Sequence, residues 1–318
     1  MKHSFSTTAL LIFLFVAAQI IGLSLIAMSQ EVHVTPSGQE VSYSATALGE
    51  RPQTEGATSL LMIAIGVGVG TMLALLLIKL GARVAWKIWF LAASWIALSL
   101  ALGVLIPRGI AITLAAALAA WKVFKPNPII HNLTEILVYG GIAVLLVPLF
   151  DIVWVIALLV LISIYDWIAV HRTGHMVTLA KGQAASEVFA GLAVPTGNAQ
   201  QRGNASPSTI TARAPSPARY AATKTVKKDL GTVGGTAVLG GGDIAFPLVF
   251  AGVVLQWLIE SRGLLPVHAL GAALIIPLGA TVALSWLFAV AKKGKFYPAM
   301  PPITAGCLIG LGIIALLF

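Results

Sequence analysis

Charged residues are scarce in this sequence. Only 10% of its 318 residues are Asp, Glu, Lys or Arg, whereas 58% are hydrophobic, and the mean hydropathy is +0.95. A soluble domain of ordinary composition carries about 25% charged residues. This shortage excludes a soluble globular fold and predicts an all-α polytopic membrane protein that is embedded in a lipid bilayer.

The sequence also lacks several catalytic and structural motifs. Its single cysteine, Cys307, excludes an intramolecular disulfide and a CxxC metal or redox site. The absence of HExxH argues against a zinc intramembrane protease, and the absence of Gly-x-Ser-x-Gly argues weakly against a serine nucleophile. His171 and His175 are four residues apart, but such a pair after an apolar segment is typical of a solvated helix end. We therefore expect neither a metal nor a cofactor.

Long apolar runs, separated by short polar or proline-containing breaks, are abundant. The first run, 9–28, is longer than the roughly 7–15 residues of a signal-peptide core, which favours a retained span over a cleaved signal. The spans group into an N-terminal membrane part (1–170) and a C-terminal one (232–318), joined by a cytoplasmic loop (171–231). Nine transmembrane helices are expected: 9–28, 60–78, 88–106, 110–123, 129–150, 152–170, 242–259, 264–290 and 301–318.

The distribution of basic residues over the loops predicts the orientation. If the N-terminus is cytoplasmic and nine spans alternate, 17 of the 20 Lys and Arg residues fall on the cytoplasmic side, where such residues concentrate. The exceptions are Arg51, Arg108 and Arg262. Without the long loop, which is a weaker indicator, the division is still nine to three. Orientation therefore explains the net charge of +9, no nucleic-acid partner is needed, and the C-terminus is expected outside.

Two extramembrane stretches have recognisable character. The polar segment after the first span is expected to contain short strands at Glu31–Thr35 and Glu40–Ser44. The middle of the long loop, Gly197–Pro217, is rich in Ser, Thr, Asn, Pro and Gly and has no periodicity, so we expect it to be disordered.

Two aspartates occur where a charge is costly. Asp166 lies near the end of one apolar run, beside Tyr165, and Asp243 follows three glycines, Gly240–Gly242, at the start of another. A charge inside lipid costs several kcal/mol, so an acid in such a place is a functional candidate by default. With the orientation above, Asp166 lies about 6 Å inside the cytoplasmic boundary.

The glycines decide the depth of Asp243. A helix that began at the start of its apolar run would place Asp243 about 16 Å deep, away from Asp166. Each glycine costs about 1 kcal/mol in a helix, however, and six glycines crowd residues 231–242. We therefore expect an extended lead-in that ends at Leu239 and a helix that starts near Gly242. Asp243 then lies level with Asp166, at a helix N-terminus that favours a carboxylate.

A third stretch reaches the same level from the same side. Pro298 and Pro301 cannot both continue a helix, so Pro298, Ala299 and Met300 are expected to be extended as they lead into the last span. Non-helical backbone at this depth must be buried in protein or line a wet cavity. Both irregular stretches therefore predict a water-accessible cavity around the two acids.

Paired carboxylates can support peptide hydrolysis. Two carboxylates a few Å apart share one proton: the ionised group can activate water, and the protonated group can bind the carbonyl and later protonate the leaving amine. Flanking glycines admit a substrate backbone, and the lead-in Thr236–Leu239 could pair with an unwound substrate as an added strand. The alternative is a proton- or ion-coupled transporter that uses Asp166 and Asp243 as a relay, although the internal repeats of many transporters are not evident.

Three motifs in this order resemble the signatures of the presenilin and signal-peptide-peptidase intramembrane aspartyl proteases. They are Tyr165-Asp166, Gly-x-Gly-Asp at 240–243, and Pro298-Ala299-Met300. The resemblance covers the whole chain through span count and motif order, and the cytoplasmic N-terminus is similar to that of the presenilin branch. A prepilin-type peptidase shares a Gly-x-Gly-Asp, but it would need neither of the other two motifs.

The resemblance implies roles for these residues. Asp166 and Asp243 would be the catalytic pair, Tyr165 a neighbour that orients Asp166, and the glycines and Leu239 the surroundings of the substrate. Pro298, Ala299 and Met300 would shape the cleft, where the family has Pro-Ala-Leu; Leu to Met nearly conserves volume, so we expect the cleft to survive. The implied substrates are transmembrane polypeptides, and the implied location is the cell membrane, in a compact protein of the archaeal or bacterial presenilin-like type.

Two features stay open. Glu135 lies in the fifth expected span, where it could either snorkel to the cytoplasmic surface or act beside the two aspartates. Presenilins cut themselves in the long loop, and Glu187–Thr196 is the most apolar patch of that loop here, so self-cleavage at this patch is a weak hypothesis.

Overall fold

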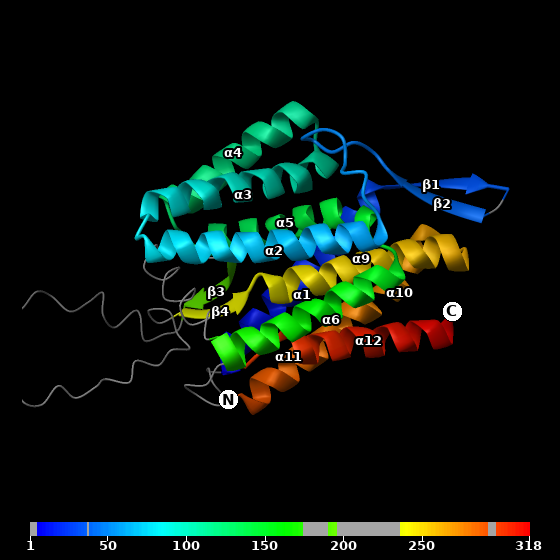
Figure 1. Ribbon diagram of the computed structural model, residues 1–318. Helices are drawn as coiled ribbons and strands as arrows, with labels where there is room; N and C mark the ends of the chain where they lie inside the picture. Colours follow the sequence, from blue (N-terminus) through cyan, green and yellow to red (C-terminus); the bar gives the residue numbers. More distant parts are fainter. Residues whose placement is uncertain (1–4, 37, 174–189, 196–235, 292–296) are drawn as a thin grey trace, which may run out of the picture.

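The computed structural model of the chain describes residues 5–36, 38–173, 190–195, 236–291 and 297–318. They form a bundle of helices with two small antiparallel sheets (Figure 1). The expected disorder of 197–217 lies outside the described residues. The elements are α1 (Phe5–Ser29), β1 (Gln30–Thr35), β2 (Gly38–Tyr43), α2 (Gly56–Lys79), α3 (Arg83–Leu105), α4 (Arg108–Phe124), α5 (Pro128–Leu146), the 3-10 turn η1 (Val147–Leu149), α6 (Ile152–Ile168), the π-helical turn η2 (Ala169–Thr173), β3 (Gly191–Pro195), β4 (Thr236–Gly240), α9 (Gly242–Arg262), α10 (Pro266–Ala273), α11 (Ile275–Val290) and α12 (Met300–Leu317).

The helices match the apolar runs of the sequence. In the described part of the chain, eight helical segments are long and apolar enough to cross a membrane, whereas α4, with 17 residues, is shorter. The expected span 264–290 corresponds to one apolar segment, Pro266–Val290, whose helix is interrupted at Leu274 between α10 and α11. Pro277 explains this break, since it has no N–H for the Ala273 carbonyl and its ring would clash with that group.

Helix α9 forms the core of the bundle. It contacts α1, α5, α6, α10, α11 and α12, and Leu248, Phe250 and Leu255 on it are fully buried. At the periphery, α2 buries only 6% of its spanning window, and side chains such as Leu61 and Met72 are exposed. So much exposed apolar surface would be unusual for a protein in water, and it is accounted for if these helices face lipid.

Glycines bring several helix backbones into direct contact. A Cβ atom at Gly306 in α12 would lie 2.3 Å from the carbonyl oxygen of Gly279 in α11, and the same holds in reverse. A Cβ atom at Gly141 in α5 would lie 1.9 Å from the carbonyl oxygen of Ala97 in α3. Helices in lipid associate through such close packing, because their apolar surface gains little by leaving the lipid.

The two sheets lie at opposite ends of the bundle (Figure 1). The strands expected at Glu31–Thr35 and Glu40–Ser44 are confirmed as the antiparallel hairpin β1–β2. The extended lead-in expected at Thr236–Leu239 is confirmed as β4. Its antiparallel partner, β3, was not expected from the sequence, and it comes from the apolar patch of the long loop.

The hairpin holds one end of α9. The Tyr43 hydroxyl donates to Gln256 Oε1 at 3.0 Å, and the Val41 N–H donates to Glu260 Oε1 at 3.2 Å. The opposite end of α9 begins directly after β4. The central helix is therefore fixed by a sheet at each end, and its first turn carries Asp243.

We expect Gly306→Ala to destabilise the contact between α11 and α12, because the added Cβ would force the two backbones apart. Overpacking of this kind should lower the unfolding free energy by about 1–3 kcal/mol, and the thermal midpoint of the purified protein in detergent should fall with it. Gly312→Ala in the same helix is the matched control, because nothing lies within 4 Å of its Cβ position. Equal midpoints for the two variants would contradict this packing.

Candidate active site

Asp166 lies in the last turn of α6 and is 6% exposed. Its Oδ2 accepts the backbone N–H of Met300 at 3.0 Å. Met300 is the first residue of α12, and the N–H groups of a first helical turn have no partner within their own helix. The Asp166 carboxyl group therefore caps α12 from outside and joins the first and third sequence motifs.

Tyr165 points away from this contact. Its side chain is 40% exposed, and its hydroxyl donates to Thr71 Oγ1 in α2 at 3.3 Å. A tyrosine has only one O–H group to donate. Tyr165 therefore ties α6 to α2, and its hydroxyl proton is not directed at Asp166.

Asp243 lies in the first turn of α9, which begins at Gly242 as the glycines predicted. A Cβ atom at Gly240 would lie only 3.1 Å from Asp243 Oδ2, so the half-buried carboxyl group folds back beside a residue that has no side chain. Pro247, one turn later, cannot donate to the Asp243 carbonyl. The carbonyl oxygen beside the carboxyl group therefore lacks its usual helical donor.

The two acids lie at the same end of the bundle. The end of α6 and the start of α9 adjoin each other there (Figure 1), and the two helices are packed together. The start of α9 at Gly242, which the glycines predicted, therefore brings Asp243 to the end of the bundle where Asp166 lies.

The other two glycines of the turn have different surroundings. A Cβ atom at Gly241 would lie 2.9 Å from the hydroxyl oxygen of Tyr139 in α5, so this residue is fixed against the protein core. Gly242 is exposed, and a Cβ atom there would meet only the Phe246 ring at an ordinary 3.5 Å. Gly242 is therefore the position of the turn that another backbone could approach.

The third motif lies next to Asp166. Pro298 and Ala299 are half-buried and precede the helix, whereas Met300 is 2% exposed. The expectation that all three residues are extended was wrong for Ala299, whose backbone is in the right-handed helical region, and for Met300, which is the first residue of α12. Prolines at the first positions of α12 suit a helix start, where a missing N–H costs nothing. Because Met300 reaches Asp166 through its backbone, the identity of its side chain does not decide this contact.

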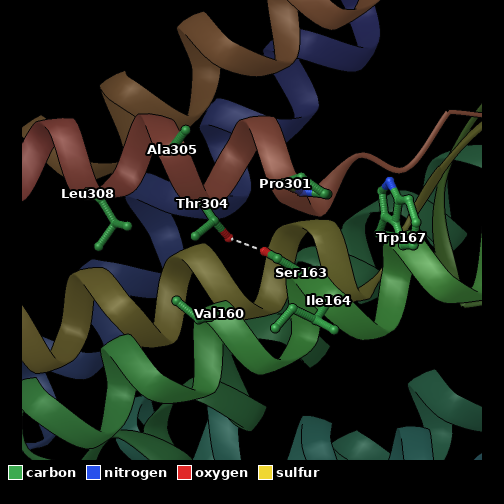
Figure 2. A pocket seen from close by; sticks show the side chains of 8 residues that line it. All are labelled: Val160, Ser163, Ile164, Trp167, Pro301, Thr304, Ala305 and Leu308. Atoms are coloured by element: carbon green, nitrogen blue, oxygen red, sulfur yellow. Dashed lines mark hydrogen bonds between the residues drawn. The ribbon is translucent and has the colours of Figure 1, made fainter.

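A groove of about 430 Å³ runs between α6 and α12 (Figure 2). Its walls are mostly apolar, and the one polar link across it joins the Ser163 and Thr304 hydroxyls at 2.6 Å. Ser163 lies one turn before Asp166 on the same helix. The groove therefore follows α6 to the turn that carries Asp166, although neither Asp166 nor Asp243 lines it. Its lining residues are Val160, Ser163, Ile164, Trp167, Pro301, Thr304, Ala305 and Leu308.

Glu135 does not snorkel, because its side chain is 1% exposed and fully partnered. One carboxylate oxygen forms an ion pair with Lys122 of α4, and the other accepts the Tyr139 hydroxyl and, at 3.2 Å, the Gly191 N–H of β3. Lys122 and Tyr139 were not predicted from the sequence as partners of Glu135. The available signal was a pair of opposite charges in consecutive apolar runs, on either side of a short turn.

The register of the β3–β4 sheet identifies its free edge, which is the edge of β4 that pairs with no strand among the described residues. In an antiparallel pair, the backbone groups of alternate residues point to opposite edges. Gly191 and Ala193 bond to α5 side chains, so Leu192 and Val194 face β4. Val238 pairs opposite Ala193, so its N–H and C=O point away from β3, and its side chain is 38% exposed.

No three His, Cys, Asp or Glu side chains lie close enough to hold a metal ion within the described ranges. His171 is exposed at the end of the sixth span, and its ring stacks on Trp167. His175 lies outside the described residues.

Comparison with known proteins gives consistent results. A family model described as signal-peptide peptidase, presenilin aspartyl protease matches residues 11–318. A solved structure of a presenilin family intramembrane aspartate protease in space group C222 is 18% identical, with a TM-score of 0.57 and 97% of both chains covered. A structure with the same description in space group P2 is 20% identical, with a TM-score of 0.54 and the same coverage. At this identity the likeness establishes the fold. No curated protein matches.

We expect Lys122→Met to be strongly destabilising, because it leaves the buried Glu135 carboxylate without its counter-charge. Breaking one partner of a buried ion pair costs about 3–5 kcal/mol. The double variant Lys122→Met with Glu135→Gln removes both charges and should recover a large part of that loss, as measured by chemical unfolding in detergent. If the loss of unfolding free energy in the double variant equals the sum of the losses in the two single variants, the two charges are not coupled.

Proposed function

The chain belongs to the signal-peptide peptidase and presenilin family of aspartyl proteases, and we propose that it hydrolyses peptide bonds within transmembrane segments by a two-aspartate mechanism. The observation that carries this proposal is that the packed helices α6 and α9 hold Asp166 and Asp243 at the same end of the bundle, where β4 also lies (Figure 1). Both acids lie in apolar helices, where a charged side chain is costly, so both are candidates for function.

The mechanism divides acid and base roles between the two carboxyl groups, which together hold one proton. The ionised group removes a proton from water, and the hydroxide formed attacks the peptide carbonyl carbon. The protonated group stabilises the carbonyl oxygen as charge develops on it. When the C–N bond breaks, a proton passes to the leaving nitrogen, and the dyad returns to its starting state with one proton.

The substrate must be unwound before water can reach a peptide bond, because a helical peptide bond is shielded by its neighbours. The free edge of β4 offers the backbone groups of Val238 to an extended segment, which would join the sheet as a third strand. The strand β4 ends with Leu239 and Gly240, and Gly241 links it to Gly242. The exposed Gly242 leaves room for the substrate backbone. Pro298, Ala299 and Met300 shape the other side of the cleft, through the contact of Met300 with Asp166.

We infer nine membrane crossings, with α4 as a short fourth span of about 26 Å. In support, α1 begins at the end of the bundle that holds β3 and β4, and α12 ends at the opposite end (Figure 1), as an odd number of crossings requires. The distribution of basic residues places the catalytic end and the N-terminus in the cytoplasm and the C-terminus outside. The protein is then a multi-pass protein of the cell membrane.

The chain is divided so that each part supplies one acid. The N-terminal part, 1–170, carries Asp166, the C-terminal part, 232–318, carries Asp243, and the loop 171–231 joins them. Self-cleavage within Gly191–Pro195 would first require β3 to leave the sheet, because this strand is bonded along both edges.

We expect Asp166→Asn and Asp243→Asn each to lower cleavage of a single-span substrate at least about 100-fold, the size of a lost general acid or base. Products from enzyme in proteoliposomes can be quantified by mass spectrometry. Asp151→Asn is the matched control: Asp151 caps the opposite end of α6 by accepting the Val153 and Trp154 N–H groups, and an Asn caps a helix equally well.

Full cleavage by either aspartate variant would refute the two-aspartate mechanism. If the wild-type protein never cleaves but its proteoliposomes transport protons or ions, the relay alternative replaces proteolysis. Thermal midpoints close to that of the wild type would show that lost cleavage is not lost folding.

We expect Met300→Leu to keep activity within about twofold of the wild type, because the exchange nearly conserves volume and leaves the N–H donor to Asp166 in place. Met300→Pro removes that N–H and should lower the cleavage rate strongly. Equal rates for the two variants in the same cleavage assay would show that the bond to Asp166 is unimportant.

A further inference from the structure

The start of α5 takes the place of a strand along the outer edge of β3. The Asn132 side-chain amide donates from Nδ2 to the Ala193 carbonyl at 2.7 Å, and its Oδ1 accepts the Ala193 N–H at 2.8 Å. These are the two bonds that a residue of a neighbouring strand would make. One side chain therefore completes the ladder at the centre of β3.

The neighbouring residue of β3 that faces the same edge is held in a similar way. The Gly191 N–H donates to Glu135 Oε2 at 3.2 Å, and the Gly191 carbonyl oxygen lies 2.8 Å from His131 Nε2. Glu135 is in turn fixed by Lys122 and Tyr139. The outward-facing backbone groups of β3 are thus bound by rigid side chains of one helix rather than by another strand.

The same helix also supports the turn that carries Asp243. Tyr139, one turn after Glu135, lies directly against Gly241. The helix α5 therefore contacts β3, which pairs with β4, and Gly241, which directly follows β4 in the chain. A rigid support at both places fixes the position of β4 relative to Asp243.

We propose that Asn132 is a positioning residue, which holds β3, and through it β4, so that an added substrate strand binds in a single register relative to Asp243. This inference rests on the proposed proteolytic function. Asn132 does not contact the substrate or the reacting atoms. By locking the sheet against α5, it determines which peptide bond of the substrate reaches the two carboxyl groups.

The position of the cut distinguishes a positioning role from a merely structural one. A loss of folded enzyme lowers the amount of every product equally, whereas a loosened β4 lets the substrate bind in more than one register. Because a strand repeats every two residues, neighbouring registers expose different peptide bonds to the dyad. The distribution of cut sites is therefore the decisive measurement.

The chain offers a matched control at the same helix end. Asn127 caps α5, and its side chain accepts the Ile129 N–H at 2.8 Å within its own helix. Asn127→Ala removes an asparagine side chain of equal size without touching β3. Asn132→Asp keeps the acceptor for the Ala193 N–H but loses the donor to its carbonyl, so it should have an intermediate effect.

The test uses the full chain in proteoliposomes with a single-span peptide substrate whose products are identified by mass spectrometry. For Asn132→Ala we expect KM to rise about tenfold, the effect of one or two lost hydrogen bonds, with kcat within about twofold. We also expect the main cut site to be accompanied by cuts at neighbouring bonds. Amide hydrogen exchange in 190–195 and 236–240 should accelerate in Asn132→Ala and not in Asn127→Ala.

Several outcomes would overturn the proposal. One is an unchanged cut site with unchanged KM, and another is a uniform loss of all products, which indicates a purely structural role. Unchanged amide exchange in Asn132→Ala would also contradict a positioning role, and this measurement does not depend on proteolysis. If Asn132→Ala does not fold, Asn132→Asp decides by the same criteria. Failure of the proposed function would instead be seen in the wild type, or in cleavage by Asp243→Asn.

Discussion

Every backbone N–H and C=O group inside a bilayer needs a partner within the protein, and this requirement shapes the end of the bundle where the two aspartates lie. The irregular backbone needed there for peptide hydrolysis is costly unless side chains satisfy it. Asp166 accepts the first N–H of α12, and Asn132 pairs with both backbone groups of Ala193. The outer edge of β4 is not paired with another strand among the described residues, and this edge is where an unwound substrate could bind.

Buried charge obeys the same principle. Lys122 and Glu135 form an ion pair, and the second carboxylate oxygen of Glu135 accepts from the Tyr139 hydroxyl and the Gly191 N–H, so neither charge is isolated. The cluster around Glu135 is satisfied and serves to hold the structure. Asp166 and Asp243 lie at one end of the packed helices α6 and α9, and the sharing of one proton between them belongs to the proposed mechanism.

The parts of the fold that depend on local chemistry could be predicted from the sequence. Lengths of apolar runs located the helices, and the cost of glycine in a helix placed the start of α9 at Gly242. The break between α10 and α11 was also local, since Pro277 marks it, but the apolar run concealed it. The strand β3 was not predictable in this way, because its partner β4 is more than 40 residues away and its outer edge is completed by side chains of α5.

The sequence by itself determined that this is a membrane protein, where its helices lie, and which two aspartates are candidates for chemistry. These conclusions depend on hydrophobicity and backbone propensity, which act over one or a few turns. Only the tertiary structure decided that Asp166 caps α12 at Met300, that Glu135 is buried against Lys122, and that β4 is the strand with a free edge. Each of these depends on groups from different helices meeting in space, and packing of the bundle alone brings them together.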